Sequence, residues 1–313
     1  LLADGSFHSG VELGQRLGIT RAAVWKIISQ LEQIGLQTES VKGVGYRLTE
    51  PLSLLSYSTI IGKADASVKH LIESLAIKAS LESTNDYVKA YMESQQGYMI
   101  CLAEHQSAGR GRRGKSWISP YGKNLCMSIG FRFERGFEAL NGLSLVVGIA
   151  VARSIADLGL AAKLKWPNDV WIEKKKVAGI LVEVDGEQGG PLNLIVGLGV
   201  NVNMKPCDAE IDQPWTSLAT ELSKEVDRSA LAASLITNLL ILMEQFKQRG
   251  FVGMKEEWKK FDGVSGSRVT LANQDQEEQG ICRGVDHRGY LLLESDGKVQ
   301  AFSGGELSLR IAS

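Results

Sequence analysis

The stretch Gly109-Arg110-Gly111-Arg112-Arg113-Gly114 decides which kind of α/β fold the chain can adopt. Its spacing matches G-x-G-x-x-G, the dinucleotide-binding fingerprint, which requires a helix to begin directly after the glycines. Here residues 115–120 follow, with β-favouring side chains and a proline. The motif therefore predicts a glycine-rich loop, and it excludes a Rossmann fold.

The charge of this loop predicts an anion site. Glycine-rich backbone can surround an anion with N–H groups, and guanidinium groups bind phosphate or carboxylate through paired hydrogen bonds. A solvated basic loop is the alternative. Glycines between the charges favour a loop that closes over a ligand, because the ligand supplies the energy of ordering it.

The region around the loop, residues 59–262, mixes helices with apolar strands. We expect helices at 85–94, at 140–158 and, interrupted at two glycines, at 230–261. We expect strands at 99–103, 125–133, 180–184 and 192–200. Strands in succession with helices between some of them predict an α+β or mixed sheet with helices on one side.

A second candidate segment of this region is Lys165-Trp166-Pro167-Asn168-Asp169, followed by three lysines at 174–176. Carboxylate oxygens suit Mg²⁺, so Asp169 is a candidate ligand for nucleotide-bound metal. Lysines in a turn commonly face solvent. Lys176 differs from its neighbours because it abuts the apolar segment 177–184, which favours an ammonium group that points inward.

Two further segments carry weaker signals. Ser83-Thr84-Asn85 stands at a predicted helix start, where such residues commonly cap the helix, and it could also contact a ligand there. Asn201 closes a predicted strand among glycines, where backbone can approach a nucleotide closely.

Residues 1–50 predict a winged helix-turn-helix. Ser9-Gly10-Val11-Glu12 has the form of a capping box and starts a helix. Gly18 supplies a turn, Gly14 allows the helices to approach, and Thr20 can cap a second helix at 21–34. Short strands at 38–41 and 46–48 then form a hairpin, so the helix-turn-helix extends from about Gly10 to Ser29.

The second helix of such a head enters the DNA major groove, and the hairpin meets phosphate. The candidate DNA contacts are Thr20, Arg21, Ala22, Lys26 and, on the hairpin, Lys42. Residues 1–50 hold five basic and five acidic residues, so their net charge is zero. A helical hairpin used for protein contacts is therefore the alternative.

The remaining segments complete the domain plan. Residues 51–58 form a Pro/Ser/Leu linker. Residues 263–313 hold five short predicted strands separated by turn residues, at 268–272, 279–285, 290–294, 299–302 and 307–310. Five short strands in about fifty residues predict a small β-barrel.

Composition agrees with a globular chain of several domains. Its 313 residues carry 35 Lys+Arg against 36 Asp+Glu and are 44% hydrophobic, which excludes disorder and a polycationic nucleic-acid coat. Apolar runs are shorter than a membrane-spanning helix needs, and no signal peptide is visible. The four cysteines are scattered, which favours a reducing cytoplasm and no disulfides: Cys101, Cys126, Cys207 and Cys282.

Taken together, the motifs resemble the bacterial biotin–protein ligases. They occur in order as Glu82-Ser83-Thr84-Asn85, residues 103–114, Lys165-Trp166-Pro167-Asn168-Asp169 and residues 176–181. The head at 1–50 resembles that of the bifunctional subgroup, which also represses the biotin operon. The resemblance covers essentially the whole chain and implies a class II synthetase-like mixed-sheet ligase domain followed by an SH3-like barrel.

The resemblance also implies chemistry and site residues. Biotin and ATP, with Mg²⁺, form biotinyl-5′-AMP, and the biotinyl group then passes to a lysine of the biotin carboxyl carrier protein of acetyl-CoA carboxylase. The implied catalytic residues are Lys176, Arg112, Arg110 and Asp169. The implied biotin contacts are Ser83, Thr84, Asn85, Gln106, Arg110, Gly111, Arg112 and Lys176, and the implied adenylate contacts are Arg112, Trp117, Asn168 and Asn201.

A regulatory switch is implied as well. Adenylate serves as intermediate and co-repressor, favours a homodimer through the central domain, and places two heads on operator DNA. No membrane partner is expected. Two alternatives stand beside this reading: a biotin-sensing repressor without useful ligase activity, and a lipoate or octanoate ligase on the same fold. The complete glycine-loop and Lys176 motifs argue against a repressor without ligase activity. The glycine loop also favours biotin over lipoate or octanoate as the substrate.

Overall fold

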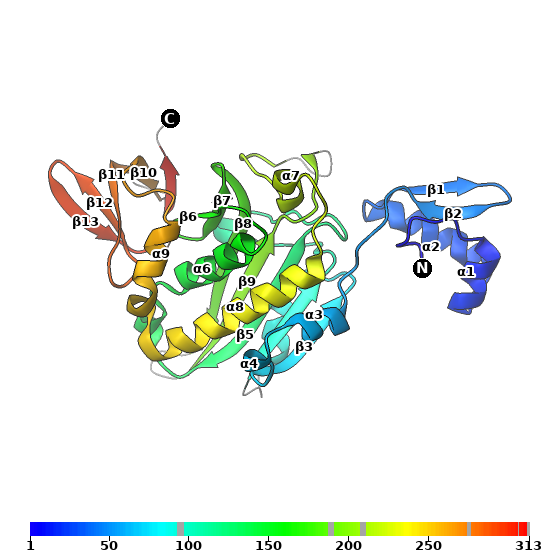
Figure 1. The fold of residues 1–313 in the computed structure, drawn as a ribbon, viewed down its shortest axis with the longest axis horizontal. Coiled ribbons are helices and arrows are strands. Elements are labelled where there is room, and N and C mark those ends of the chain that lie inside the picture. The colour runs from blue at the N-terminus through cyan, green and yellow to red at the C-terminus, as the bar shows by residue number, and fades with distance from the viewer. Residues whose placement is uncertain (93–96, 187–190, 207–210, 274–276, 306, 312–313) are drawn as a thin grey trace.

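A computed structural model of the chain places three parts one after another (Figure 1). The structure describes residues 1–92, 97–186, 191–206, 211–273, 277–305 and 307–311. A small helical head lies at one end, a large mixed sheet with its helices lies in the middle, and a small antiparallel sheet lies at the other end. Cys207 falls outside the described residues, and the other three cysteines are buried free thiols.

The head is the predicted winged helix-turn-helix. Its elements are α1 (Gly10–Leu17), α2 (Arg21–Gln33), β1 (Thr38–Val41) and β2 (Gly45–Leu48). Ser9 Oγ accepts the N–H of Glu12 at 3.1 Å, and Thr20 Oγ1 accepts that of Ala23 at 3.2 Å, so both expected caps are confirmed. A Cβ on Gly14 would lie 2.8 Å from the Ile19 carbonyl oxygen, which explains why a glycine stands where the helices meet.

A seven-stranded mixed sheet forms the central part. Its strands are β3 (Ile72–Lys78), β4 (Tyr98–Ala103), β5 (Leu125–Phe133), β6 (Lys163–Lys165), β7 (Asp169–Ile172), β8 (Lys175–Asp185) and β9 (Leu192–Val200). They lie in the order β3-β4-β5-β9-β8-β7-β6, and among these neighbours β3 and β4 run parallel while the others run antiparallel. The expected mixed sheet is confirmed, with β3, β6 and β7 added to it.

Helices cover both faces of this sheet, so the expectation of helices on one side is wrong. The central helices are α3 (Tyr57–Lys63), α4 (Ala66–Lys69), α5 (Thr84–Tyr91), α6 (Leu143–Ala156), α7 (Leu218–Leu222), α8 (Arg228–Arg249) and α9 (Lys255–Phe261). The main core packs α6 and α8 against alternate strand residues such as Ile100 and Leu102. α5 packs on the opposite face, where Val88 contacts a separate cluster with Met99 and Cys101.

Two apolar segments are longer than the apolar runs of the sequence indicate. Phe137–Ala156 and Arg228–Arg249 are long and apolar enough to cross a membrane by length and composition. In each, 61% of the apolar window is buried inside the protein. Both segments are accounted for by the core, because α6 and α8 pack on one another and on the sheet (Figure 1).

The C-terminal part is the expected antiparallel SH3-like sheet. It comprises β10 (Arg268–Ala272), β11 (Glu277–Val285), β12 (Leu291–Ser295), β13 (Lys298–Phe302) and β14 (Ser308–Ile311), in the order β13-β12-β11-β10-β14. Its apolar side chains join the main core of the central part. Trp166 Nε1 donates to the Gly289 carbonyl at 3.1 Å across this junction.

The head has a core of its own, and polar contacts hold the segment that joins it to the central part. Glu50 accepts from Lys123 at 2.6 Å and from Lys205 at 2.8 Å, and these ammonium groups lower the pKa of Glu50 to about 2. Further along, Arg228 donates to the Ser53 carbonyl at 2.6 Å. Helix α3 begins at Tyr57, inside the range 51–58 expected for the linker.

Candidate active site

A cavity on the α5 face of the central sheet gathers most of the predicted site residues. Its lining includes Ser83, Thr84, Asn85, Gln106, Arg110, Gly111, Arg112, Trp117, Asn168 and Lys176. Strand residues complete it, among them Gly179, Gly197 and Gly199. Of the predicted ligand-binding residues, Asp169 and Asn201 do not line this cavity.

The start of α5 forms one end of the cavity. Ser83 occupies the N-cap position but makes no side-chain capping bond, so its hydroxyl is not used as the ordinary cap that residue preferences suggest. Thr84 donates from its backbone N–H and its hydroxyl to Gln106 Oε1, at 2.8 and 3.0 Å. The fully buried Ser128 hydroxyl lies 2.6 Å from Thr84 Oγ1 and 2.5 Å from Asn85 Oδ1. Ser128 was missed by the sequence analysis, although a lone hydroxyl in an apolar strand was a usable signal.

Two glycines of β9 form the floor. A Cβ on Gly197 would lie 2.5 Å from Asn85 Oδ1, and one on Gly199 would lie 2.2 Å from Trp117 Cε2. The glycines therefore let an amide and an indole lie directly on the strand. The Trp117 Nε1 hydrogen is buried without a hydrogen-bond partner in the part of the chain that the structure describes. Leaving such a donor unpaired is costly, and here it lies on the same indole edge that packs against Gly199.

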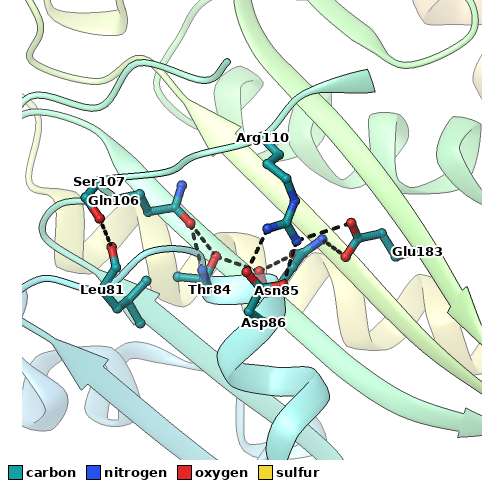
Figure 2. A network of polar contacts seen from close by, with 9 residues as sticks. Leu81, Thr84, Asn85, Asp86, Gln106, Ser107, Arg110 and Glu183 are labelled. Carbon is teal, nitrogen blue, oxygen red and sulfur yellow. Dashed lines mark hydrogen bonds and ion pairs between the residues drawn. The ribbon is translucent and has the colours of Figure 1, made fainter. Parts of the chain in front are cut away.

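The glycine loop is a short hairpin that projects over the cavity. The Gly111 N–H donates to the Lys115 carbonyl at 2.6 Å, and the Trp117 N–H donates to Gly109 at 2.8 Å. Figure 2 shows Arg110 reaching from this loop to the start of α5, where its guanidinium contacts Asp86, and to Glu183 on β8. Neither carboxylate was predicted from the sequence.

Arg112 reaches in another direction, toward the C-terminal part. It donates to Asn168 Oδ1 at 3.1 Å and to the carbonyls of Gly304, at 2.5 Å, and Gly305. Burial lowers the pKa of this guanidinium from its ordinary value. Asn168 in turn donates to the Ile180 carbonyl at 2.9 Å, which fixes its amide beside the loop. Two parts of the chain nearly two hundred residues apart thus meet at one arginine.

Lys176 points inward, as its position before an apolar segment predicted. Its ammonium lies 2.7 Å from Asp169 Oδ1, and both side chains are about 15% exposed. Lys165 lies 3.7 Å from the same carboxylate, and burial lowers the pKa of Lys165. A carboxylate between two ammonium groups does not fit the predicted role of Asp169 as a Mg²⁺ ligand. The described residues also contain no group of three or more His, Cys, Asp or Glu side chains that could hold a metal ion.

Asn201 is placed behind the site. Its Nδ2 donates to the Thr216 carbonyl at 3.2 Å, and its Oδ1 accepts from Asn124 at 3.4 Å. Only 3% of the residue is exposed. Its amide thus joins two segments of the protein, and the nucleotide contact expected of Asn201 stays a prediction.

Ion pairs within the head explain part of its zero net charge. Arg47 pairs with Glu39 at 2.6 Å, and Arg16 lies 3.7 Å from Glu12, so these charges cancel locally. Three basic residues that the sequence analysis assigned to DNA make no ion pair within the described residues: Arg21, Lys26 and Lys42. All three are exposed, as is Ala22, on α2 and at the tip of the hairpin. Trp25, 62% exposed on α2, was not predicted as a contact.

Family models match all three parts of the chain. Residues 77–201 match the biotin/lipoate A/B protein ligase family, residues 1–47 match an HTH domain, and residues 264–310 match the biotin protein ligase C-terminal domain. The active-site cavity lies mainly within the first of these ranges, and the free cations of the head lie within the second.

Known proteins are similar over the whole length. The bifunctional ligase/repressor BirA of Escherichia coli is 41% identical over all of this chain and 96% of its own, and that of Bacillus subtilis is 30% identical over 98% and 95%. The structure of biotin protein ligase from Aquifex aeolicus in complex with biotin and ATP matches 77% of this chain and all of its own, at 28% identity and a TM-score of 0.67. The chain belongs to the bifunctional biotin ligase/repressor family.

Proposed function

We propose that the chain is a biotin–[biotin carboxyl carrier protein] ligase that also represses transcription. Biotin carboxylate attacks the α-phosphate of ATP, which forms biotinyl-5′-AMP and releases pyrophosphate. The ε-amine of a carrier lysine then attacks the mixed anhydride and releases AMP. The observation that supports this most directly is the cavity that brings the α5 start, the glycine loop and Lys176 together.

The polarity of the cavity matches a ligand that is neutral at one end and anionic at the other. Neutral donors and acceptors of Thr84, Gln106 and Ser128 gather at the α5 end. Cationic groups of Lys176 and Arg112 line the rest. We assign the neutral end to the biotin ring and the cationic region to the acyl phosphate, where both steps develop negative charge.

The remaining residues of the site have supporting roles in this proposal. Trp117 supplies an aromatic surface for adenine, next to Asn168. Mg²⁺ would neutralise phosphate charge, and it would enter with ATP through its phosphates and water, as this ion commonly does. Asp169 acts through Lys176, whose ammonium it orients.

The test is ATP–pyrophosphate exchange with Mg²⁺, measured with biotin, lipoate or octanoate as the acid. Exchange with biotin alone supports the proposal. Exchange with lipoate or octanoate instead would keep the fold and replace the substrate. Absence of exchange with biotin, in protein that binds biotin and operator DNA, would favour a sensor without useful ligase activity.

Replacing Arg112 with glycine should release the adenylate before transfer. The substitution removes a guanidinium that binds Asn168 and the carbonyls of Gly304 and Gly305, so the glycine loop loses its attachment at that end. We expect labelling of bystander lysines, read by mass spectrometry after incubation with carrier protein and serum albumin. Labelling confined to the carrier would show that this attachment does not retain the intermediate.

Repression in this proposal depends on an adenylate-linked homodimer. Strand β8 pairs with β7 only as far as Gly179, and the structure shows no strand paired with its stretch 181–185 on that side in the described residues. An open strand edge of this kind can pair with another strand, including its own copy in a dimer. The dimer places two heads on a two-fold operator of the biotin genes. Sedimentation at micromolar protein with and without adenylate tests this, and a monomer in both states would contradict it.

The wing lysine provides a test of the DNA contacts. Lys42→Ala should weaken operator binding for every sequence and lower the salt slope of log K by about one, because one phosphate contact is lost. The matched control is Arg16→Ala, since Arg16 already lies beside Glu12 at 3.7 Å. Binding isotherms of the adenylate-loaded protein at several salt concentrations give both slopes. An equal change in the two variants would assign the effect to net charge alone.

We place the whole system in the cytoplasm, where carrier protein and operator are both present.

A further inference from the structure

Asp86, in the first turn of α5, makes the best-formed ion pair at the rim of the active site. Arg110 Nη1 lies 2.6 Å from Asp86 Oδ2, and Arg110 Nη2 lies 2.7 Å from Asp86 Oδ1 (Figure 2). The two parallel bonds match the planar fork of the guanidinium to the carboxylate, which gives the contact a defined direction as well as strength.

A second carboxylate fixes the same guanidinium. Glu183 Oε1 lies 3.4 Å from Arg110 Nη2, while its other oxygen accepts from Asn85 Nδ2 at 2.9 Å. Glu183 stands on β8 and Asp86 on α5, so Arg110 is held from two elements that are themselves joined through Asn85. The hydrogen bonds from Arg110 hold the pKa of Asp86 below its usual range, so the carboxylate stays ionised to a more acidic pH than a free aspartate does.

This contact contributes little to the stability of the fold. The Arg110 side chain is 40% exposed and that of Asp86 is 50% exposed, and ion pairs in such surroundings are weak stabilisers. The position of the ion pair beside the cavity is more informative about its role than its contribution to stability. Arg110 lines the cavity, and Asp86 lies outside the cavity lining, one helix residue beyond Asn85. The arginine therefore spans the opening from the glycine loop to α5.

The glycine loop is thus attached at two points, one on the C-terminal part and one on α5 and β8. Arg112 binds the carbonyls of Gly304 and Gly305 in the C-terminal part, and Arg110 binds Asp86 and Glu183. Between them lies Gly111, which lines the cavity itself. A loop held at both sides can close over a ligand, and a loop held at one side can swing away from it.

We propose that Asp86 and Glu183 form a latch for Arg110, which keeps the glycine loop closed over bound biotinyl-5′-AMP until the carrier lysine arrives. Asp86 is a positioning residue in this role, because it acts on the ligand through Arg110. The inference rests on the proposed function, since it requires that an adenylate is made and retained.

Asp86→Asn tests the latch, with the off-rate of preformed, radiolabelled biotinyl-5′-AMP as the readout. The variant keeps the shape of the side chain and removes its charge. We expect release faster by on the order of fivefold, the scale of one good exposed ion pair. Asp86→Glu should restore slow release in part, and Arg110→Lys should release faster, because lysine cannot form the paired bonds. Glu134→Gln is the control, since it also removes one exposed carboxylate charge, and Glu134 pairs with Arg132 at 2.9 Å outside the cavity lining.

The outcomes separate this inference from the proposed function. If the unaltered chain makes no adenylate from biotin and ATP, the proposed function fails. If it does, and Asp86→Asn releases adenylate at the unaltered rate with an unchanged melting temperature, the latch is wrong. Slower release from Asp86→Asn would also overturn it, because Asp86 would then compete with the ligand for Arg110. Equal acceleration in Glu134→Gln would assign the effect to surface charge.

Discussion

Replacing Lys176 with alanine should lower biotin-dependent ATP–pyrophosphate exchange by about a hundredfold to a thousandfold, the usual cost of removing one group that stabilises transition-state charge. Lys176 lines the cavity, and Asp169 holds its ammonium at 2.7 Å. Attack on the α-phosphate develops negative charge beside this group. The affinity for biotin should change much less, because the proposed function assigns the ring to the α5 end of the cavity.

The neighbouring lysine supplies the control. Lys175 is exposed and adjacent in the same strand, so Lys175→Ala changes net charge equally without touching the cavity. Exchange by Lys175→Ala should match that of the unaltered chain, as should its melting temperature. Equal loss in both variants, or near-normal exchange by Lys176→Ala, would remove Lys176 from the catalytic role.

Arg228→Met should destabilise the protein by about 3–5 kcal/mol, the usual cost of leaving one partner of a buried ion pair alone. Arg228 is fully buried, and its Nη2 lies 2.6 Å from Glu104 Oε2. It also donates to the Ser53 carbonyl at 2.6 Å and to the Asn124 carbonyl at 2.9 Å. Methionine matches much of the volume but none of these bonds, so Glu104 keeps a buried charge.

Urea denaturation followed by circular dichroism measures this loss. Arg132→Met is the control, because its partner Glu134 is 72% exposed and such a pair contributes only about 0.5 kcal/mol. A loss for Arg228→Met no larger than for the control would mean that water or a shifted side chain compensates Glu104. The same variant should weaken the hold on the linker, since Glu104 Oε1 also accepts the Leu55 N–H at 2.6 Å.

Capping residues and apolar runs predicted the helix starts and strands that depend only on neighbouring residues in the sequence. The caps at Ser9 and Thr20 and the apolar strands β5 and β9 were found at or near their observed bounds, because hydrogen-bonding side chains and continuous apolar runs identify them directly. β6 and β7 were missed, since strands of three and four residues carry too little pattern. The placement of α5 on the second face was missed as well, because a helix pattern does not say which face of a sheet it covers.

Site residues that belong to sequence motifs were predicted. Site residues that are brought into place by contacts between distant segments were not. Lys176 and the glycine loop were identified from residue type and neighbours. Asp86 and Glu183 carry no motif, and their role depends on Arg110, which lies 24 and 73 residues away along the chain. The contact of Arg112 with the C-terminal part likewise depends on how separate segments pack. The two hydrogen bonds of Asn201 also depend on long-range packing, and its predicted nucleotide contact stays a prediction.

The separation of the two hydrophobic cores has an evolutionary consequence. The head keeps its own cluster, with Leu13, Val24 and Ile28 at its centre, while the central and C-terminal parts share one continuous core. A substitution among the buried residues of the head cluster leaves the side chains of the shared core unchanged, so the sequence of the head can vary more freely than that of the rest of the chain. The catalytic and C-terminal parts have no such freedom, because a change in one is felt by the other through their common interior.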